Sequence, residues 1–294
     1  MALKDYLLVF ITVILWGLNA VFVRFGLGQI PPFLITAMRL LLITVFLFPF
    51  IPKPPKAMRK HLITISLLLG IGHFGLLNFS LLGIDSGTGA TLIQLGVPFS
   101  ALLATFLLKE QPSLATILGT FGAFIGVYIL AGGASGIGNP VYFIAAVLSA
   151  FAWACANIVI KKLKDVSALQ IGFYIGFYSW PLMFLFSYLS GEGNPISIMA
   201  ASNWKGWASV LYSTIGSNII ANTLWYKLLS KNNINNIVFF SFLTPVSSFI
   251  GGLIIMNEPI LFYKVIGAVI VIGSIGLSEY VKNYKYRKLL RKRV

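Results

Sequence analysis

The sequence of 294 residues contains one cysteine, Cys155, and only two histidines. A single thiol excludes an intramolecular disulfide framework and any metal site built from clustered cysteines. Charged residues are also scarce, at 10% of the chain, whereas soluble domains contain about 25%. The composition therefore offers little material for a soluble surface and none for a disulfide-bonded domain.

Hydrophobic residues instead make up 58% of the chain, and the mean hydropathy is +0.90. A soluble protein of this size must cover itself with polar groups, whereas a lipid bilayer removes that requirement. The net charge of +15 lies in short clusters between apolar runs. Nucleic-acid binding needs a basic face on a folded domain, so we do not expect a nucleic acid as a partner. We predict an integral membrane protein.

Ten apolar runs are long enough to cross a bilayer, which takes about 20 helical residues. The first is too long for a signal peptide and no small-residue cleavage site follows it, so we expect it to remain as a span. Only 190–204 is a connecting loop of any length. The predicted class is all-α integral membrane, with ten transmembrane helices at 6–27, 33–51, 62–82, 89–108, 114–131, 141–160, 169–189, 205–228, 236–256 and 261–281.

The distribution of lysine and arginine predicts the orientation. If the N-terminus is cytoplasmic, 18 basic residues fall on the cytoplasmic side and three, Arg24, Lys205 and Lys264, on the other. Basic residues favour cytoplasmic loops, so we expect both termini in the cytoplasm of a multi-pass protein of the inner (plasma) membrane. The basic tail is a topology anchor in this interpretation, and it can also attract anionic lipid.

The two halves of the sequence repeat each other. Trp16 and Asn19 recur as Trp153 and Asn157, and the segment from Pro98 to Gly119 recurs from Pro245 to Gly267. An odd number of spans in each copy turns the second copy upside down, a recurrent design in transporters. We therefore predict two inverted five-helix repeats, at 1–138 and 139–294.

With these residues the chain resembles the drug/metabolite transporter superfamily, in its EamA-like branch. Within that branch it looks most like bacterial exporters of O-acetylserine and cysteine, from which it differs at His73 and Pro98. The resemblance implies a carrier of amino-acid metabolites, although relatives also move nucleotide-like metabolites and drugs. It rests on Trp16-Gly17-Leu18-Asn19, Met38-Arg39-Leu40, Gln94, Trp153 to Asn157 with Lys161-Lys162, Leu224-Trp225 and the segment from Pro245 to Glu258.

Arg39 lies inside the second predicted span, about 10 Å past Pro32 at 1.5 Å per helical residue. A guanidinium at this depth costs several kcal/mol unless it finds a partner, water or the interface. It can bind a substrate carboxylate through two hydrogen bonds. It can also extend to the membrane surface or cap a helix end, and from the sequence we favour the helix-end role.

Other polar side chains in the spans are candidates for substrate contacts or for helix–helix hydrogen bonds. Asn19 and Asn157 each share a helix face with a tryptophan, and Asn218 and Asn222 share one at i,i+4 spacing. Aromatic walls with a few polar groups are typical of small-ligand pockets. The predicted substrate-binding set is Trp16, Asn19, Arg39, His73, Asn78, Gln94, Trp153, Asn157, Tyr174, Tyr178, Asn218, Asn222 and Trp225.

No aspartate or glutamate lies near the middle of a predicted span, so the usual carboxylate proton relay is missing. His73 can carry protons near neutral pH or form a core hydrogen bond. Coupling would use His73 or a carboxylate at a span end; otherwise the substrate runs down its own gradient, which we favour. We expect no cofactor and no metal. Pro98 and Pro245, equivalent in the repeats, are candidate gates, because broken helices are tolerated where they line a cavity.

The sequence thus predicts a secondary transporter that exports a small polar metabolite, such as an amino acid or derivative, by alternating access. The alternative is a carrier of nucleotide-type metabolites or drug-like compounds. An intramembrane enzyme would need paired carboxylates, a histidine cluster or a nucleophile with its base, and none is visible. A channel would show rings of like charge or filter motifs. A homodimer is possible through Gly122 and Gly126, although we favour packing of that motif within the chain.

Overall fold

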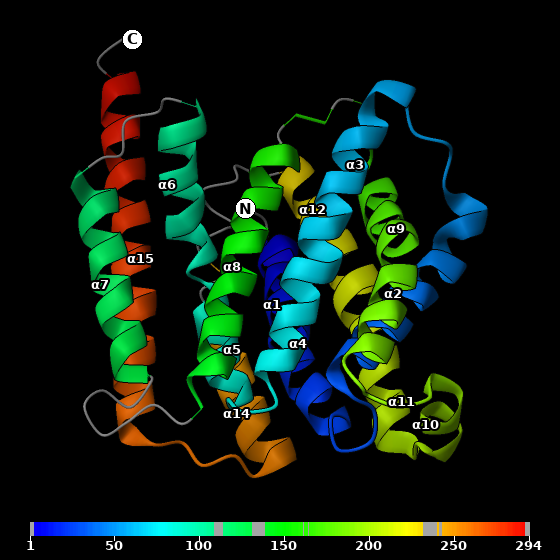
Figure 1. The fold of residues 1–294 in the computed structure, drawn as a ribbon. Coiled ribbons are helices and arrows are strands. Elements are labelled where there is room, and N and C mark those ends of the chain that lie inside the picture. Colours follow the sequence, from blue (N-terminus) through cyan, green and yellow to red (C-terminus); the bar gives the residue numbers. More distant parts are fainter. Residues whose placement is uncertain are drawn as a thin grey trace.

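The computed structural model describes residues 3–108, 114–130, 139–160, 162–163, 165–231, 240 and 243–291. All regular secondary structure within these ranges is helical. The helices run side by side in a bundle whose long axes are roughly aligned (Figure 1).

The first half begins with a long helix, and its third predicted span is one continuous helix from Arg59 to Ser80 that comprises α3, η3 and α4. Its helices are α1 (Leu3–Gly26), α2 (Pro32–Leu47), η1 (Phe48–Phe50), η2 (Lys56–Met58), α3 (Arg59–Ser66), η3 (Leu67–Gly75), α4 (Leu76–Ser80), α5 (Ser86–Ile93), α6 (Gly96–Leu108) and α7 (Leu114–Leu130). The second half comprises α8 (Pro140–Ile160), α9 (Ala168–Leu189), α10 (Pro195–Ala201), α11 (Trp204–Leu211), η5 (Tyr212–Ala221), α12 (Asn222–Lys231), α14 (Thr244–Met256) and α15 (Phe262–Arg291).

Five helices are long and apolar enough to cross a membrane, namely Lys4–Gly26, Pro32–Phe50, Lys56–Ser80, Pro140–Ile160 and Leu169–Leu189. Shorter apolar helices cover Ile117–Leu130, Thr244–Met256 and Phe262–Ser278. The predicted spans all coincide with helix over the residues described, while 109–113 and most of 232–242 lie outside them. The helical class is thus confirmed for the residues described, five helices fit a membrane by length and composition, and the number of ten spans stays a prediction.

Proline explains two local departures from the predicted spans. The fourth span is split between Ile93 and Gly96, because the ring of Pro98 has no N–H for the carbonyl of Gln94 and would clash with it in a continuous helix. The Gln94 carbonyl accepts from Val97 instead, at 3.0 Å. The segment 190–204, predicted as a loop, contains α10, which starts at Pro195 with Asn194 as its side-chain cap.

Two stretches of π-helix stand at corresponding places in the two repeats. η3 occupies Leu67–Gly75 in the third predicted span, and η5 occupies Tyr212–Ala221 in the eighth. π-helical turns are rare and occur frequently at functional sites. The repeat therefore extends to this irregularity of the backbone, and His73 and Asn218 lie within the two stretches.

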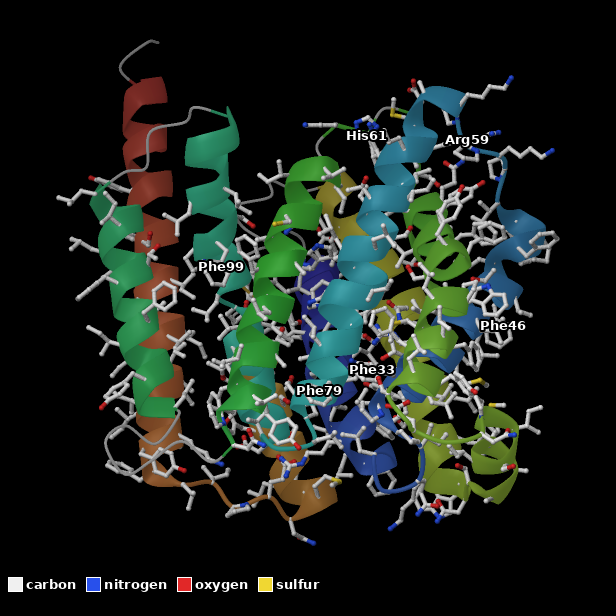
Figure 2. The ribbon with its side chains drawn as sticks, in the orientation of Figure 1. Phe33, Phe46, Arg59, His61, Phe79 and Phe99 are labelled. Atoms are coloured by element: carbon white, nitrogen blue, oxygen red, sulfur yellow. The ribbon has the colours of Figure 1, made fainter. Side chains whose placement is uncertain are left out.

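The ends of the bundle differ in charge as the orientation predicts. Arg59 and His61, at the start of α3, lie at the same end of the bundle as the last turns of α15 (Figure 1 and Figure 2). The end of α14 and the start of α15 lie at the opposite end, and α10 and α11 lie at this end too (Figure 1). This opposite end is the predicted extracellular face, and it carries Arg24, Lys205 and Lys264.

Small residues let helices of the two halves approach each other closely. A Cβ on Gly126 of α7 would lie 2.8 Å from the Gly267 carbonyl of α15, so the predicted glycine motif packs within the chain. A Cβ on Gly17 of α1 would lie 1.7 Å from the Ser247 hydroxyl of α14. Both contacts hold a helix of the first repeat against one of the second.

Candidate functional site

Arg39 is enclosed in the bundle without a hydrogen-bond partner for two of its nitrogens. Its side chain is 1% exposed, and Nε and Nη1 have no acceptor among the residues described. Its Cζ lies 4.0 Å from the centroid of the Phe74 ring, a cation–π contact. The low exposure does not fit a side chain that reaches the membrane surface, and the free nitrogens do not fit a helix cap.

Asn78 is fully buried next to α2. Its Nδ2 donates to Thr36 Oγ1 at 2.9 Å, while its Oδ1 has no partner among the residues described. Thr36 precedes Arg39 by three residues, so the two side chains lie on one face of α2. Asn78 of α4 is therefore bonded to α2 one turn before Arg39, although the sequence predicted the two residues separately.

His73 is bonded to α8 through Ser149. Ser149 Oγ donates its hydrogen to the His73 carbonyl at 3.0 Å, so it accepts from Nδ1, which lies 2.9 Å away. Nδ1 also lies 3.2 Å from the Ser149 carbonyl. Two acceptors around one nitrogen place the imidazole proton on Nδ1. This geometry favours a hydrogen-bonding role for His73.

We expect Ser149→Ala to lower the free energy of unfolding by about 1 kcal/mol, the scale of one interhelical hydrogen bond in a membrane. Thermal unfolding in detergent measures this change. The pH profile of transport should stay that of the parent, because the imidazole only joins two helices. A shifted pH profile in Ser149→Ala would instead assign His73 to proton coupling.

A second cluster joins α1 to the η5–α12 segment. Trp16 Nε1 donates to Asn222 Oδ1 at 3.1 Å, and the Trp16 and Trp225 rings lie 4.9 Å apart. Asn222 is 3.5 Å from Asn218 Oδ1, and Asn218 donates to the Ser213 carbonyl at 2.9 Å. Four of the predicted residues thus form one connected aromatic and amide cluster.

Asn19 and Asn157, the predicted repeat pair, differ in their surroundings. Asn19 is 8% exposed and its Oδ1 has no partner among the residues described. Asn157 is half-buried on α8. The unpartnered oxygen of Asn19 is a second acceptor in the interior that is open to a ligand.

The remaining predicted residues pack elsewhere in the bundle. Trp153 lies against Gly96, where α6 begins, since a Cβ there would be 2.3 Å from the indole. Gln94 lies in the break between α5 and α6, and its side chain is not free. Tyr174 and Tyr178 stack on each other at 5.8 Å in a cluster with Leu62. The substrate role of these residues stays a prediction.

A charged network at the predicted extracellular face was not foreseen from the sequence. We call Arg24, Asp85, Ser86, Glu258 and Lys264 the outer network. Arg24 Nη1 lies 3.1 Å from Glu258 Oε1. Glu258 Oε2 accepts from Ser86 Oγ at 2.6 Å and from Ser86 N at 3.2 Å. Lys264 pairs with Asp85, which caps α5 through Thr88 N.

The backbone at the end of α14 is shaped to aim Glu258 at α5. Asn257 ends the helix in the left-handed conformation at φ 52°, which asparagine tolerates better than most residues. A Cβ on Gly252 would lie 2.3 Å from Glu258 Oε2 and 2.6 Å from Ser86 Oγ. Only glycine leaves room for this contact. Because Arg24 and Ser86 belong to the first repeat and Glu258 to the second, the network joins the two repeats.

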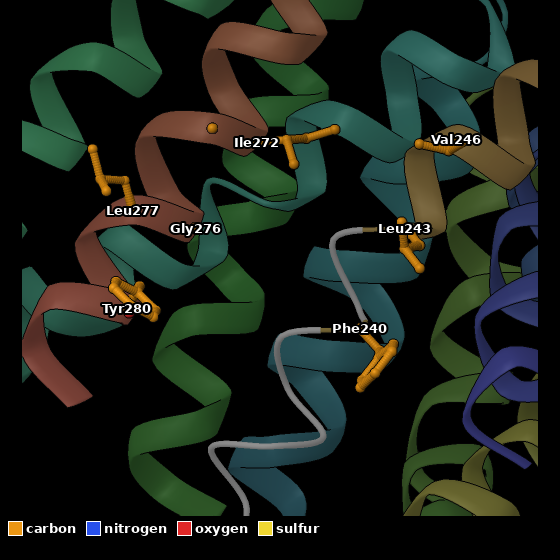
Figure 3. A pocket seen from close by; sticks show the side chains of 8 residues that line it. Phe240, Leu243, Val246, Ile272, Gly276, Leu277 and Tyr280 are labelled. Carbon is orange, nitrogen blue, oxygen red and sulfur yellow. The ribbon is translucent and has the colours of Figure 1, made fainter. Parts of the chain in front are cut away.

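A hollow between α14 and α15 is a poor match for a polar metabolite. It has a volume of about 500 Å³, and Leu243 and Val246 face Ile272, Leu277 and Tyr280 across it (Figure 3). The lining is apolar and bears no charged side chain. Within the described ranges no group of three or more His, Cys, Asp or Glu residues is placed to hold a metal ion.

Comparisons with known proteins agree with this architecture. The model of the EamA-like transporter family matches residues 3–132 and again 141–279. A protein of Salmonella typhimurium named "Probable amino-acid metabolite efflux pump" is 26% identical over 99% of both chains. A protein of the same name from Escherichia coli K12 is 24% identical over 99% of both chains.

More distant similarities extend the comparison. The "Uncharacterized transporter YoaV" of Bacillus subtilis is 22% identical, over 91% of this chain and 94% of its own. A solved structure described as a crystal structure of a protein superposes with a TM-score of 0.63 at 18% identity, over 96% of this chain and 98% of the other. That likeness shows a shared fold. With the family model matched twice over almost the whole length, the chain belongs to the EamA-like transporter family.

Proposed function

We propose that the protein is a secondary carrier that exports a small polar metabolite, such as an amino acid or a derivative, by alternating access. The observation that carries the proposal is the outer network, in which polar and charged groups of both repeats close one face of the bundle. Contacts of this kind can be exchanged for water when the repeats move apart, whereas a continuous apolar core cannot open at so low a cost.

The interior behind the network supports a polar substrate. Unpartnered, buried acceptors or donors remain on Asn19, Arg39 and Asn78. Each is costly in a membrane unless a ligand or water satisfies it. The printed names of the Salmonella and Escherichia relatives point to the same class of cargo.

The prolines at the helix starts are the proposed gates. Pro245 lies in the first turn of α14, and Pro98 is the third residue of α6. In the fourth span a turn at Gln94 and Leu95 separates α5 from α6 shortly before Pro98. We expect the fourth and ninth spans to flex there, which would move the outer network with them.

The described charged residues argue against a nucleotide or a drug-like cation as the substrate. Arg39 is the only lysine or arginine that lies more than four residues from the ends of its predicted span, which is few for the several charges of a nucleotide. A drug-like cation calls for a carboxylate in the membrane interior. Asp85 and Glu258 lie at helix ends and are already paired, and Glu192 is bonded to the first N–H groups of α2.

Counterflow in proteoliposomes tests the proposed function. Vesicles with the purified full-length protein are loaded with unlabelled compound, and entry of labelled serine, cysteine, alanine, a nucleotide or a lipophilic cation is followed. Saturable, transient accumulation of an amino acid is the expected result, with protein-free vesicles as the control. Non-saturable entry would indicate a channel, and counterflow of the nucleotide or cation alone would replace the amino-acid assignment.

A further inference from the structure

Arg39 is a buried cation to which the described part of the chain offers no anion. The two ion pairs among these residues use Arg24 and Lys264. Glu192, at the extracellular start of α2, is bonded to the N–H groups of Phe33 and Leu34, both at 3.0 Å. An isolated buried charge is strongly destabilising unless a counter-charge compensates it. Among the described residues no counter-charge is placed for it, and an anionic ligand would supply one.

The ring of Phe74 fixes which edge of Arg39 a ligand can reach. With Cζ 4.0 Å from the ring centroid, one face of the planar guanidinium is covered by the aromatic ring. The N–H donors point outward in the guanidinium plane, and those on Nε and Nη1 have no acceptor within the described ranges. A planar fork of this kind matches the two oxygens of a carboxylate.

Asn78 supplies the complementary group one turn away. Its Nδ2 is bonded to Thr36 Oγ1, which fixes the amide and leaves Oδ1 as a free acceptor. Thr36 and Arg39 are neighbours at i,i+3 on α2. A zwitterion requires one acceptor for its ammonium group and one cation for its carboxylate, and Asn78 and Arg39 offer these at adjacent turns along α2.

We propose that Arg39 binds the carboxylate of an α-amino acid over the ring of Phe74, and that Asn78 Oδ1 accepts a hydrogen bond from its ammonium group. This inference rests on the proposed carrier function and names the ionic form of its cargo. Both groups are closed off in the present conformation, so the site fills when helices next to α2 move. The π-helical backbone of η3, which carries Phe74, lies at that boundary.

The test compares an amino acid with analogues that lack one charge. Serine, serinamide and 3-hydroxypropanoate share a side chain, and the last two lack the carboxylate and the ammonium group respectively. In counterflow with the full-length protein, we expect the parent to prefer serine over serinamide by about 30-fold or more, the scale for an unpaired buried charge. Arg39→Gln should remove that preference, and Arg39→Lys should keep part of it, since it retains the charge but not the fork.

Asn78→Leu provides the matched variant for the other half of the site. It should weaken serine transport about tenfold, the scale of one hydrogen bond to a charged group, and should leave 3-hydroxypropanoate unaffected. These ratios compare compounds on one protein preparation, so a partly unfolded sample does not imitate them. If the Arg39→Gln protein does not insert into the membrane, the Arg39→Lys protein provides the test. A serine-to-serinamide ratio below that of the parent then supports the Arg39 site.

The outcomes separate this inference from the function on which it rests. Amino-acid counterflow by the parent together with an unchanged serine-to-serinamide ratio in both Arg39 variants overturns the Arg39 site and leaves the carrier standing. A parent protein that transports serinamide at the same rate as serine also overturns the Arg39 site and leaves the carrier function standing. No counterflow of any compound by the parent overturns the proposed function and the site with it.

Discussion

Glu258→Gln is expected to open the predicted extracellular face of the protein. Glu258 has only 10% of its side chain exposed and joins Arg24 to Ser86. Removing its charge leaves Arg24 without its partner, and breaking such a pair costs about 2–3 kcal/mol when it is partly exposed, somewhat below the 3–5 kcal/mol of fully buried pairs. Because the loss falls on the closed form alone, the open form should gain about 30- to 150-fold in population.

The measurement uses a cysteine in the interior. Ser213→Cys is nearly isosteric, and Ser213 Oγ is buried without a partner among the described residues. Cys155 is replaced by Ser to leave one thiol. The rate of modification by a small, charged methanethiosulfonate added outside intact cells should rise with Glu258→Gln and with Arg24→Gln. Arg24→Lys, which keeps the charge, is the matched control. Equal rates in all these variants would mean that the outer network does not hold the face closed.

Gly267→Ala is expected to destabilise the protein by about 2 kcal/mol or more. A Cβ at this position would lie 2.8 Å from the Gly126 carbonyl and 2.8 Å from Leu130 N, both backbone atoms that cannot turn aside. Overpacking of a tight interface typically costs about 1–3 kcal/mol. The contact joins α7 and α15, so the loss should appear as a lower thermal unfolding temperature in detergent.

Gly273→Ala on the same helix is the control for this substitution. A Cβ on Gly273 would meet nothing within 4 Å. Alanine also favours a helix by about 1 kcal/mol over glycine, so this variant should be neutral or slightly more stable. If Gly267→Ala were as stable as Gly273→Ala, the close approach of α7 and α15 described here would be incorrect.

Those parts of the fold were predictable that depend on local sequence patterns. Apolar run length gave the helical segments, and the missing N–H of Pro98 accounts for the break at Gln94. The recurrence of Trp16 and Asn19 as Trp153 and Asn157 indicated the repeat, which the twofold match to the family model supports. The π-helical form of η3 and η5 carries no comparable signal, because it depends on backbone register within an otherwise apolar helix.

The site was predictable only in part. Arg39 and Asn78 were identified as costly polar residues in spans, but their proximity through Thr36 depends on how α2 meets α4. The outer network joins Ser86 to Glu258 across 172 residues of sequence, and no local pattern specifies that pairing. Asn257-Glu258-Pro259 was singled out from the sequence as part of the repeat. An asparagine before the glutamate, which tolerates a left-handed turn, was the hint in the sequence that Glu258 is held in a defined direction. Tyr174 and Tyr178 were predicted as a pocket wall from their spacing, which packing in an aromatic cluster satisfies equally well.

The most direct test of alternating access is two-sided modification of Ser213→Cys in the otherwise cysteine-free protein. The charged methanethiosulfonate is added to intact cells and, separately, to inside-out vesicles, each with and without the transported amino acid. The account predicts modification from both sides, slower from outside while the outer network is intact, and protection by substrate on both sides. Modification from a single side, in the parent and in Glu258→Gln alike, would contradict it.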